Sequence, residues 1–152
     1  MMVAPPPAVM DLLLIVQAIA SSAMCGIIWF VQIVHYPLFA RVRDGGREFA
    51  VENQRRTQRV VIAFMLAEAV AAAVIAWKPP VGVPRPVAFA GLGAVAMLWL
   101  STVFVQMPLH ARLAREGHAP AAVDALVRSN WLRTAVWTLR AALAAWMLRA
   151  AA

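Results

Sequence analysis

Four long apolar segments alternate with shorter polar segments along the chain. Charged residues are nearly excluded from the apolar segments, which are residues 12–40 and 86–109 with no charge, 60–77 with Glu68 alone, and 134–148 with Arg140 alone. A helix needs about 20 largely apolar residues to cross the hydrocarbon core of a bilayer, and each segment can supply that length with its flanks. The pattern predicts an all-α fold, a four-transmembrane-helix bundle that forms a single integral membrane domain over residues 1–152.

Prolines and glycines mark the expected ends of these helices. Proline lacks a backbone N–H and disfavours helix in the preceding residue, so the first helix should end or kink at Pro37 and the third should stop at Pro108. The break at Gly45 and Gly46 should precede a short interfacial helix that leads into the second span. The two long polar loops are then expected at residues 41–59 and 110–129.

Two short motifs occur twice in the chain. Asn-x-x-Arg-Thr begins at Asn53 and again at Asn130, 77 residues later, while Pro-Leu begins at Pro37 and again at Pro108, 71 residues later. Each copy lies at the same place in a pair of apolar segments. We interpret this as an internal duplication of a helical hairpin, with two parallel repeats related by an axis along the membrane normal. The tandem repeats cover residues 11–78 and 86–150.

Composition supports a membrane protein and argues against other classes. Hydrophobic residues make up 63% of the chain and charged residues 14%, and the mean hydropathy is +0.74, which is far from the composition of a soluble globular domain. The net charge of +7 does not indicate nucleic-acid binding, because the basic residues gather at the ends of spans rather than on a soluble face. Cys25 is alone, so no disulfide can form within the chain.

The basic residues also predict the orientation in the membrane. Ten of the fourteen follow the first and third apolar segments, namely Arg41, Arg43, Arg47, Arg55, Arg56, Arg59, Arg112, Arg115, Arg128 and Arg133. Short loops rich in arginine stay in the cytoplasm. Loops 41–59 and 110–129 should therefore be cytoplasmic and both termini outside. The alanine- and arginine-rich composition suggests a plasma membrane, the inner membrane of a bacterium.

Each expected helix carries its polar residues on one face, given a turn of about 100° per residue. Because lipid cannot satisfy polar groups, these faces should point toward one another and form a site inside the bundle. The candidate site residues are Gln32, His35 and Tyr36 on the first helix, Glu68 on the second, Trp99, Gln106 and His110 on the third, and Asn130, Arg133, Trp137 and Arg140 on the fourth.

Glu68 and Arg140 are the charges that lie deepest in the predicted helices. Counted from the two copies of Asn-x-x-Arg-Thr at about 1.5 Å per residue, Arg140 lies about 10 Å deep and Glu68 about 18 Å deep. An arginine side chain can span much of this difference, so we predict an intramembrane ion pair. The pair can hold the bundle together or take part in a site, and the sequence leaves both roles open.

Two histidines near the cytoplasmic ends of the odd-numbered helices allow three interpretations. His35 or His110 can act as a general base or acid at a ligand pocket. Together they can be the two axial ligands of a haem in a four-helix bundle. They can also be interfacial side chains that hydrogen-bond to loop carbonyls. Apart from this haem alternative no cofactor is predicted, and no metal site, because the chain has neither a Cys/His cluster nor paired carboxylates.

The two arginines of the repeated motif differ in their surroundings. Arg133 continues an inward-facing stripe, and its guanidinium is suited to bind a carboxylate, phenolate or phosphate. Arg56 has Arg55 and Arg59 beside it and is more typical of an arginine that reaches lipid headgroups.

The second half of the chain resembles a known family. Pro-Leu-x-x-x-Leu from Pro108 and Asn-Trp-Leu-Arg-Thr from Asn130 resemble the motif of the anthrone-oxygenase-like family of small four-span membrane proteins, which reads roughly Pro-Leu-Asn-x-x-Leu and then Asn-His-x-Arg-Thr. His110 stands where the family has Asn, and Trp131 stands where it has His. The resemblance implies a four-helix fold and the oxidation of a polycyclic anthrone to a quinone by O2 without an obvious cofactor.

Three functional hypotheses follow. In the first, the protein is an oxygenase- or oxidoreductase-like enzyme acting on a lipophilic phenol- or anthrone-like substrate. His110 or His35 takes a proton, Arg133 and Arg140 stabilise the oxyanion, and Glu68 holds Arg140. In the second, it is a non-enzymatic accessory subunit or lipid-binding scaffold with a solidly packed core, which contacts a second copy or a larger membrane complex through alanine-rich helix faces. In the third, it is a b-type haem protein.

Aromatic side chains and a cavity bear on the choice between these hypotheses. Trp99 and Trp137 would form aromatic walls that stack on the substrate of the first hypothesis. A cavity between the polar helix faces would favour that hypothesis over the second.

Overall fold

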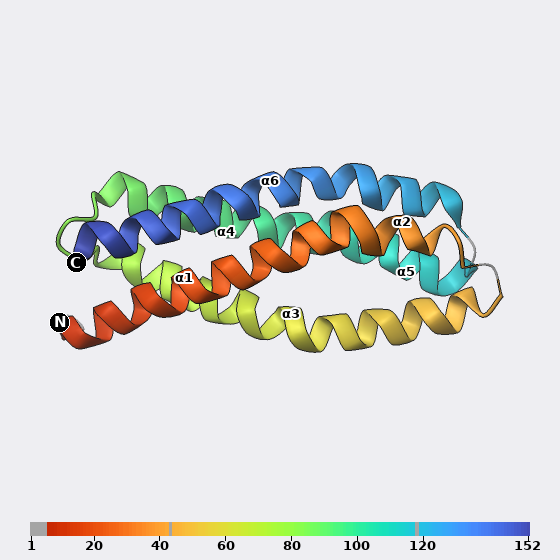
Figure 1. Ribbon diagram of the computed structural model, residues 1–152, viewed down its shortest axis with the longest axis horizontal. Coiled ribbons are helices and arrows are strands. Elements are labelled where there is room, and N and C mark those ends of the chain that lie inside the picture. The colour runs from red at the N-terminus through yellow and green to blue at the C-terminus, as the bar shows by residue number, and fades with distance from the viewer. Residues whose placement is uncertain (1–5, 43, 118) are drawn as a thin grey trace.

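The computed structural model describes residues 6–42, 44–117 and 119–152, and every regular element in these ranges is a helix. The helices form four long rods (Figure 1). In chain order the rods are α1 (Pro7–Phe30) with η1 (Val31–His35) and α2 (Tyr36–Phe39), then α3 (Gly46–Trp77), then α4 (Arg85–Ser101) with η2 (Thr102–Gln106) and α5 (Met107–Glu116), and finally α6 (Pro120–Ala151). The predicted all-α bundle is confirmed at this level.

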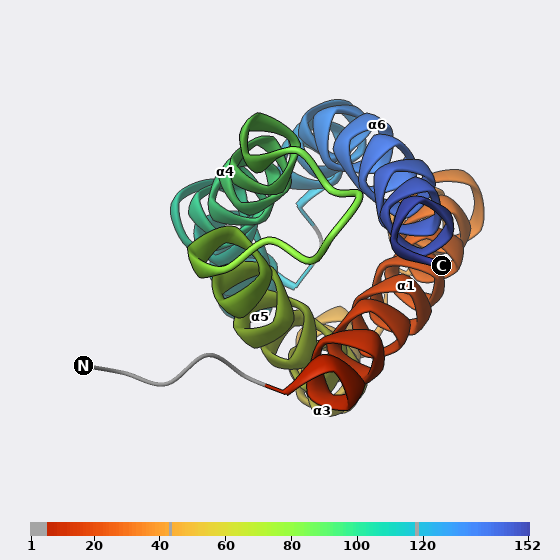
Figure 2. The same cartoon turned by 90° about the vertical axis from the view of Figure 1, so that its left-hand side faces the viewer.

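The four rods run up and down beside one another. The start of α1, the end of α6 and the α3–α4 turn lie at one end of the bundle, which we call the terminal end (Figure 1). The α2–α3 and α5–α6 connections lie at the other, the connecting end. The first rod packs on α3 and α6, and the third rod packs on the same two helices. The first and third rods are therefore diagonal to each other, as are α3 and α6 (Figure 2).

Buried residues on α1 and α6 recur at alternating spacings of three and four. They include Met10, Leu14, Gln17, Ser21, Met24 and Ile28 on α1, and Leu126, Asn130, Arg133, Trp137, Arg140, Ala144 and Met147 on α6. This heptad-like spacing is typical of helices that pack lengthwise with interlocking side chains. Outward positions carry large apolar residues, such as Ile19 at 60% and Leu139 at 70% exposure. A polar interior with an apolar exterior suits a bilayer.

Three of the rods are long and apolar enough to cross a membrane, namely Pro7–Phe39, Gly46–Trp77 and Arg85–Glu116. Their composition and length fit a lipid-bilayer environment. The fourth rod, α6, has 32 residues and is about as long, but it is less apolar because it contains several arginines. Two of these, Arg133 and Arg140, are buried inside the bundle.

The prediction that the third helix stops at Pro108 is wrong, and the first helix also continues past Pro37. Each proline follows a π-helical turn by two residues, since η1 ends at His35 and η2 ends at Gln106. A proline ring clashes with the carbonyl four residues earlier and cannot donate a backbone hydrogen bond. The wider π-turn gives this carbonyl room, so the helix continues beyond the proline.

The two long polar loops were also predicted wrongly, because most of their residues are helical. No separate interfacial helix precedes the second span: α3 is continuous from Gly46. The charges pair along the helix and so favour helix over loop. Glu52 lies 2.7 Å from Arg55 and 2.6 Å from Arg56, and Arg112 lies 2.8 Å from Glu116. Arg43, one of the arginines counted above, lies outside the described residues.

Close backbone contacts fasten both ends of the bundle. At the connecting end, a Cβ on Gly46 would lie 3.2 Å from the carbonyl carbon of Gly117, so the two connections touch. At the terminal end, Gly82 has a φ of +85°, and a Cβ there would overlap the carbonyl oxygen of Ala150. Only glycine fits at Gly82, because both its backbone conformation and the available space exclude a side chain.

We therefore predict that Gly82→Ala lowers the free energy of unfolding by more than about 1 kcal/mol, as expected where alanine cannot adopt the native φ without strain. The matched control is Gly93→Ala in α4, where an added Cβ meets no atom within 4 Å and alanine favours helix. Denaturation in detergent micelles, followed by circular dichroism, measures both. Equal midpoints for the two variants would contradict the packing of the α3–α4 turn on α6.

Candidate functional site

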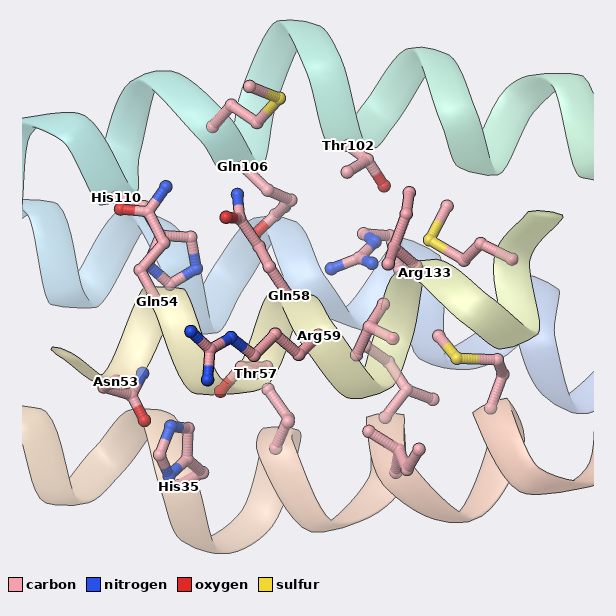
Figure 3. A pocket seen from close by; sticks show the side chains of 18 of the residues that line it. His35, Asn53, Gln54, Thr57, Gln58, Arg59, Thr102, Gln106, His110 and Arg133 are labelled. Atoms are coloured by element: carbon pink, nitrogen blue, oxygen red, sulfur yellow. The ribbon is translucent and has the colours of Figure 1, made fainter. Parts of the chain in front are cut away.

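A cavity of about 630 Å³ lies inside the half of the bundle nearer the connecting end. We call it the inner cavity, and its size is typical of small-molecule sites. Its walls are Met24, Ile27, Ile28, Val31, His35 and Tyr36 of the first rod; Asn53, Gln54, Arg55, Thr57, Gln58, Arg59, Val61, Ile62 and Met65 of α3; Trp99, Thr102, Val103, Gln106, Met107 and His110 of the third rod; and Arg133 of α6. Polar side chains from all four rods face this space (Figure 3).

Tyr36, His110 and Arg133 meet on one wall of the inner cavity. The Tyr36 hydroxyl lies 3.1 Å from Nε2 of His110, and the guanidinium of Arg133 lies within reach of the same hydroxyl. If His110 carries its proton on Nδ1, Tyr36 donates a hydrogen bond to Nε2. Tyr36 is 5% exposed and Arg133 6% exposed. An imidazole, a phenolic hydroxyl and a guanidinium are thus brought together at the cavity wall.

Residues outside the cavity lining fix the orientation of the Arg133 side chain. Oδ1 of Asn130 accepts a hydrogen bond from Nη1 of Arg133 at 3.2 Å, and Nδ2 of Asn130 donates to Oε1 of Gln32 at 2.9 Å. Gln32 in turn donates to the carbonyl of Val127 at 3.1 Å. Asn130 and Gln32 do not line the cavity, but this buried chain of hydrogen bonds links η1 to α6 and holds the guanidinium in place.

No carboxylate neutralises Arg133 in the described part of the chain. The ion pairs found there involve Arg55, Arg56, Arg112 and Arg140. Nε of Arg133 also has no hydrogen-bond partner among these residues. A buried cation without a counter-charge is costly, so the site favours a ligand with negative charge or a strong hydrogen-bond acceptor.

His35 faces the inner cavity from the opposite side to His110 and lies beside Asn53 (Figure 3). Its ring packs edge-on against Phe39, with the centroids 5.1 Å apart. Nε2 of His35 is buried and has no hydrogen-bond partner in the described ranges. His35 therefore lines the cavity separately from the Tyr36–His110 contact.

The predicted ion pair between Glu68 and Arg140 is confirmed, inside the bundle. Nε of Arg140 lies 3.0 Å from Oε1 of Glu68, and both side chains are 0% exposed. Ser21 donates a hydrogen bond to the same carboxylate oxygen at 2.6 Å. The guanidinium also packs on α4, where a Cβ at Gly91 would lie 3.4 Å from Nη1. One cluster therefore joins α1, α3, α4 and α6.

The ion pair does not line the inner cavity. Glu68 follows Met65 by one helical turn, and Met65, Met24 and Trp137 pack in one hydrophobic cluster. The cluster lies between the cavity and the charges, so Arg140 and Trp137 are not in position to touch a ligand there. This geometry favours the structural role of the pair over a role in the site.

The candidate residues thus fall into three groups. Those that line the inner cavity are His35, Tyr36, Trp99, Gln106, His110 and Arg133. Gln32 and Asn130 hold Arg133 through hydrogen bonds but do not line the cavity. Trp137 belongs to the hydrophobic cluster beside the cavity, and Glu68 and Arg140 form the ion pair beyond that cluster. Sequence reasoning missed Gln58 and Arg59, because the segment that contains them was expected to be a loop. The (i, i+4) charge pairs of Glu52 with Arg56 and Arg112 with Glu116 were the signal that could have predicted helix there.

Neither the search for a metal site nor comparison with known proteins gives a family assignment. The described residues contain no group of three or more His, Cys, Asp or Glu side chains that could hold a metal ion. No protein-family model matches the chain, and no similar protein was found among curated proteins or solved structures.

We predict that Arg140→Leu destabilises the protein by about 3–5 kcal/mol, because it leaves Glu68 buried without a counter-charge. The double variant Glu68→Leu/Arg140→Leu should be more stable than Arg140→Leu, since it removes both charges from the core. Unfolding of the single and double variants in mixed micelles gives the coupling energy. Strictly additive effects would show that the two side chains do not interact.

Proposed function

We propose that the protein is a membrane enzyme that binds a lipophilic phenol- or anthrone-like molecule in the inner cavity and deprotonates it for oxidation by O2. The observation that carries the proposal is the buried Arg133, which has no carboxylate partner among the described residues, beside the Tyr36–His110 contact at the cavity. The resemblance to the anthrone-oxygenase-like family supports the same substrate class.

In the proposed arrangement all four rods span the membrane as two tandem hairpins. The two π-turns support this duplication, because Val31 of η1 and Thr102 of η2 are 71 residues apart, the same offset as Pro37 and Pro108. The arginines near the connecting end support a cytoplasmic location for that end, following the bias of arginine toward cytoplasmic loops. Both termini then lie outside.

The proton of the substrate passes to His110. With Nε2 accepting from the Tyr36 hydroxyl, a phenolic O–H or activated C–H placed beside Tyr36 gives its proton to the hydroxyl oxygen as Tyr36 gives its own to His110. Arg133 stabilises the resulting anion by charge and by hydrogen bonding. In an anthrone, the two C–H bonds of the reacting CH2 group break, the first of them in this deprotonation. One oxygen atom of O2 becomes the new carbonyl, and the other leaves as water with the two hydrogens.

The inner cavity supports this hypothesis over a scaffold with a solid core. A purely structural bundle has no need of about 630 Å³ of space beside a buried cation, since cavities and unpaired charges both destabilise a fold. Of the alanine-rich runs, Ala71, Ala72 and Ala144 pack inside the bundle, whereas Ala73, Ala142 and Ala145 are exposed.

The two repeated arginines provide a matched test of anion binding. Arg133→Leu should weaken the binding of anthrone by about 10-fold or more, because a hydrogen bond to a charged group contributes about 1.5–3 kcal/mol. Arg56→Leu should leave binding unchanged, since Arg56 does not line the cavity and its side chain is 76% exposed. Titration calorimetry in detergent measures both, and equal affinities for the two variants would remove Arg133 from the site.

For turnover, His110→Ala should reduce the rate of anthraquinone formation by about 10²–10⁴-fold, the usual contribution of a general base. The rate is followed by absorbance and oxygen uptake, with the protein-free oxidation as the baseline. Circular dichroism confirms that the variant is folded. An unchanged rate in a folded His110→Ala protein would contradict the proposal.

The haem alternative is decided by a separate measurement. His35 and His110 face the cavity from opposite sides (Figure 3), which is the observation in its favour. Nε2 of His110, however, is already in contact with Tyr36. The proposal predicts that the purified protein has no Soret band, whereas a Soret band lost in His110→Ala would establish the haem protein instead.

A further inference from the structure

The inner cavity extends lengthwise along the bundle. Its lining residues run from Met24 to Tyr36 on the first rod, from Asn53 to Met65 on α3, and from Trp99 to His110 on the third rod. These stretches of 11 or 12 residue steps correspond to about 16–18 Å along the helix axes, at about 1.5 Å per residue. A head group bound by the Tyr36–His110 contact occupies one end of this length and leaves the other end free.

Polar and apolar groups are separated along this axis. The two histidines of the lining belong to the part toward the connecting end, together with Asn53 and Gln106, whereas Arg133 lies further along the cavity, at the level of Thr102 (Figure 3). The far part is lined by Met24, Ile28 and Met65, with the Trp99 ring. Thr102 adds little polarity, because its hydroxyl donates to the carbonyl of Leu98 at 2.8 Å. The far part therefore suits a hydrocarbon group that makes no hydrogen bonds.

The cavity also has an apolar boundary toward the outside of the bundle. Three apolar lining residues are substantially exposed, with Ile62 at 42%, Val103 at 43% and Met107 at 45%. The polar lining residues Arg55, Gln58 and Arg59 are exposed as well, nearer the connecting end on α3. The three apolar residues belong to α3 and to the third rod, which pack against each other. An apolar chain can thus enter from the lipid, where an amphiphile is concentrated, past these three apolar side chains.

We propose that the ligand is an amphiphile with a phenol-type head and one flexible hydrocarbon tail, and that the tail lies along the far part of the cavity toward Met24 and Met65. The assignment of a phenol-type head group rests on the proposed function, in which Tyr36, His110 and Arg133 bind it. The tail is a separate inference from the length and polarity of the cavity. It assigns to Met65 and Ile28 the role of selecting for tail length.

A series of 4-alkylphenols separates the two parts of the inference. The probes are 4-methylphenol, 4-pentylphenol and 4-decylphenol, bound to protein in nanodiscs at fixed lipid concentration. The affinity should rise with tail length by about fourfold for each methylene that becomes buried, which corresponds to about 0.8 kcal/mol. The rise should stop when the tail fills the far part of the cavity.

Tryptophan substitution distinguishes the cavity from simple partitioning into lipid. Met65→Trp fills the far part, whereas the control Leu66→Trp adds the same ring to the neighbouring residue of α3, which is 51% exposed and does not line the cavity. The ratio of 4-decylphenol to 4-methylphenol affinity should fall at least 10-fold in Met65→Trp and remain unchanged in Leu66→Trp. Ile28→Trp, on the opposite wall, repeats the test if Met65→Trp does not fold.

The outcomes separate the two proposals. If 4-methylphenol binds, and the ratio of 4-decylphenol to 4-methylphenol affinity is the same in wild type, Met65→Trp and Leu66→Trp, the proposed tail site is wrong and the proposed function stands. Failure of every alkylphenol to bind, with or without a tail, overturns both. A ratio that collapses only in the cavity-filling variants supports the amphiphile.

Discussion

The buried ion pair between Glu68 and Arg140 is the constraint on which the rest of the bundle depends. Neither hydrocarbon nor an apolar protein core can solvate a lone charge, so both side chains must point inward and reach each other. Their helices, α3 and α6, are diagonal, and the pair therefore crosses the axis of the bundle (Figure 2). Ser21 and Gly91 bring α1 and α4 to the same point. These contacts fix how each of the four helices is turned about its own axis at the level of the ion pair.

The packing differs on the two sides of that level. On the side of the terminal end, small buried residues such as Ala72 and Ala144 let the rods approach closely. On the side of the connecting end, the helices carry His35, His110 and Arg133, whose larger polar side chains leave the inner cavity between them. The two π-turns lie in this half, where they allow both proline-containing rods to continue as helix.

Two buried arginines on the same face of α6 differ in whether a carboxylate lies beside them, and this difference suggests different roles. Arg133 and Arg140 are seven residues apart, which is about 10 Å along the helix. Arg140 has Glu68 as its counter-charge and is sealed from the cavity by a hydrophobic cluster. Arg133 has no carboxylate partner in the described ranges and lies on the cavity wall. The first stabilises the bundle, and we assign the second to the ligand.

The sequence alone determined the all-helical architecture, the inward direction of the polar faces and the Glu68–Arg140 pair, because each follows from the cost of placing polar groups in hydrocarbon. It did not determine where helices end: Pro108 was expected to end a helix, and the charged segments at 47–59 and 110–116 were assigned to loops, but all of them lie within helices. Only the tertiary structure decided that Tyr36 meets His110, 74 residues away, and that a cavity remains beside them. Helical periodicity specifies which face a residue occupies, whereas contacts and empty space depend on how side chains of different size pack between helices.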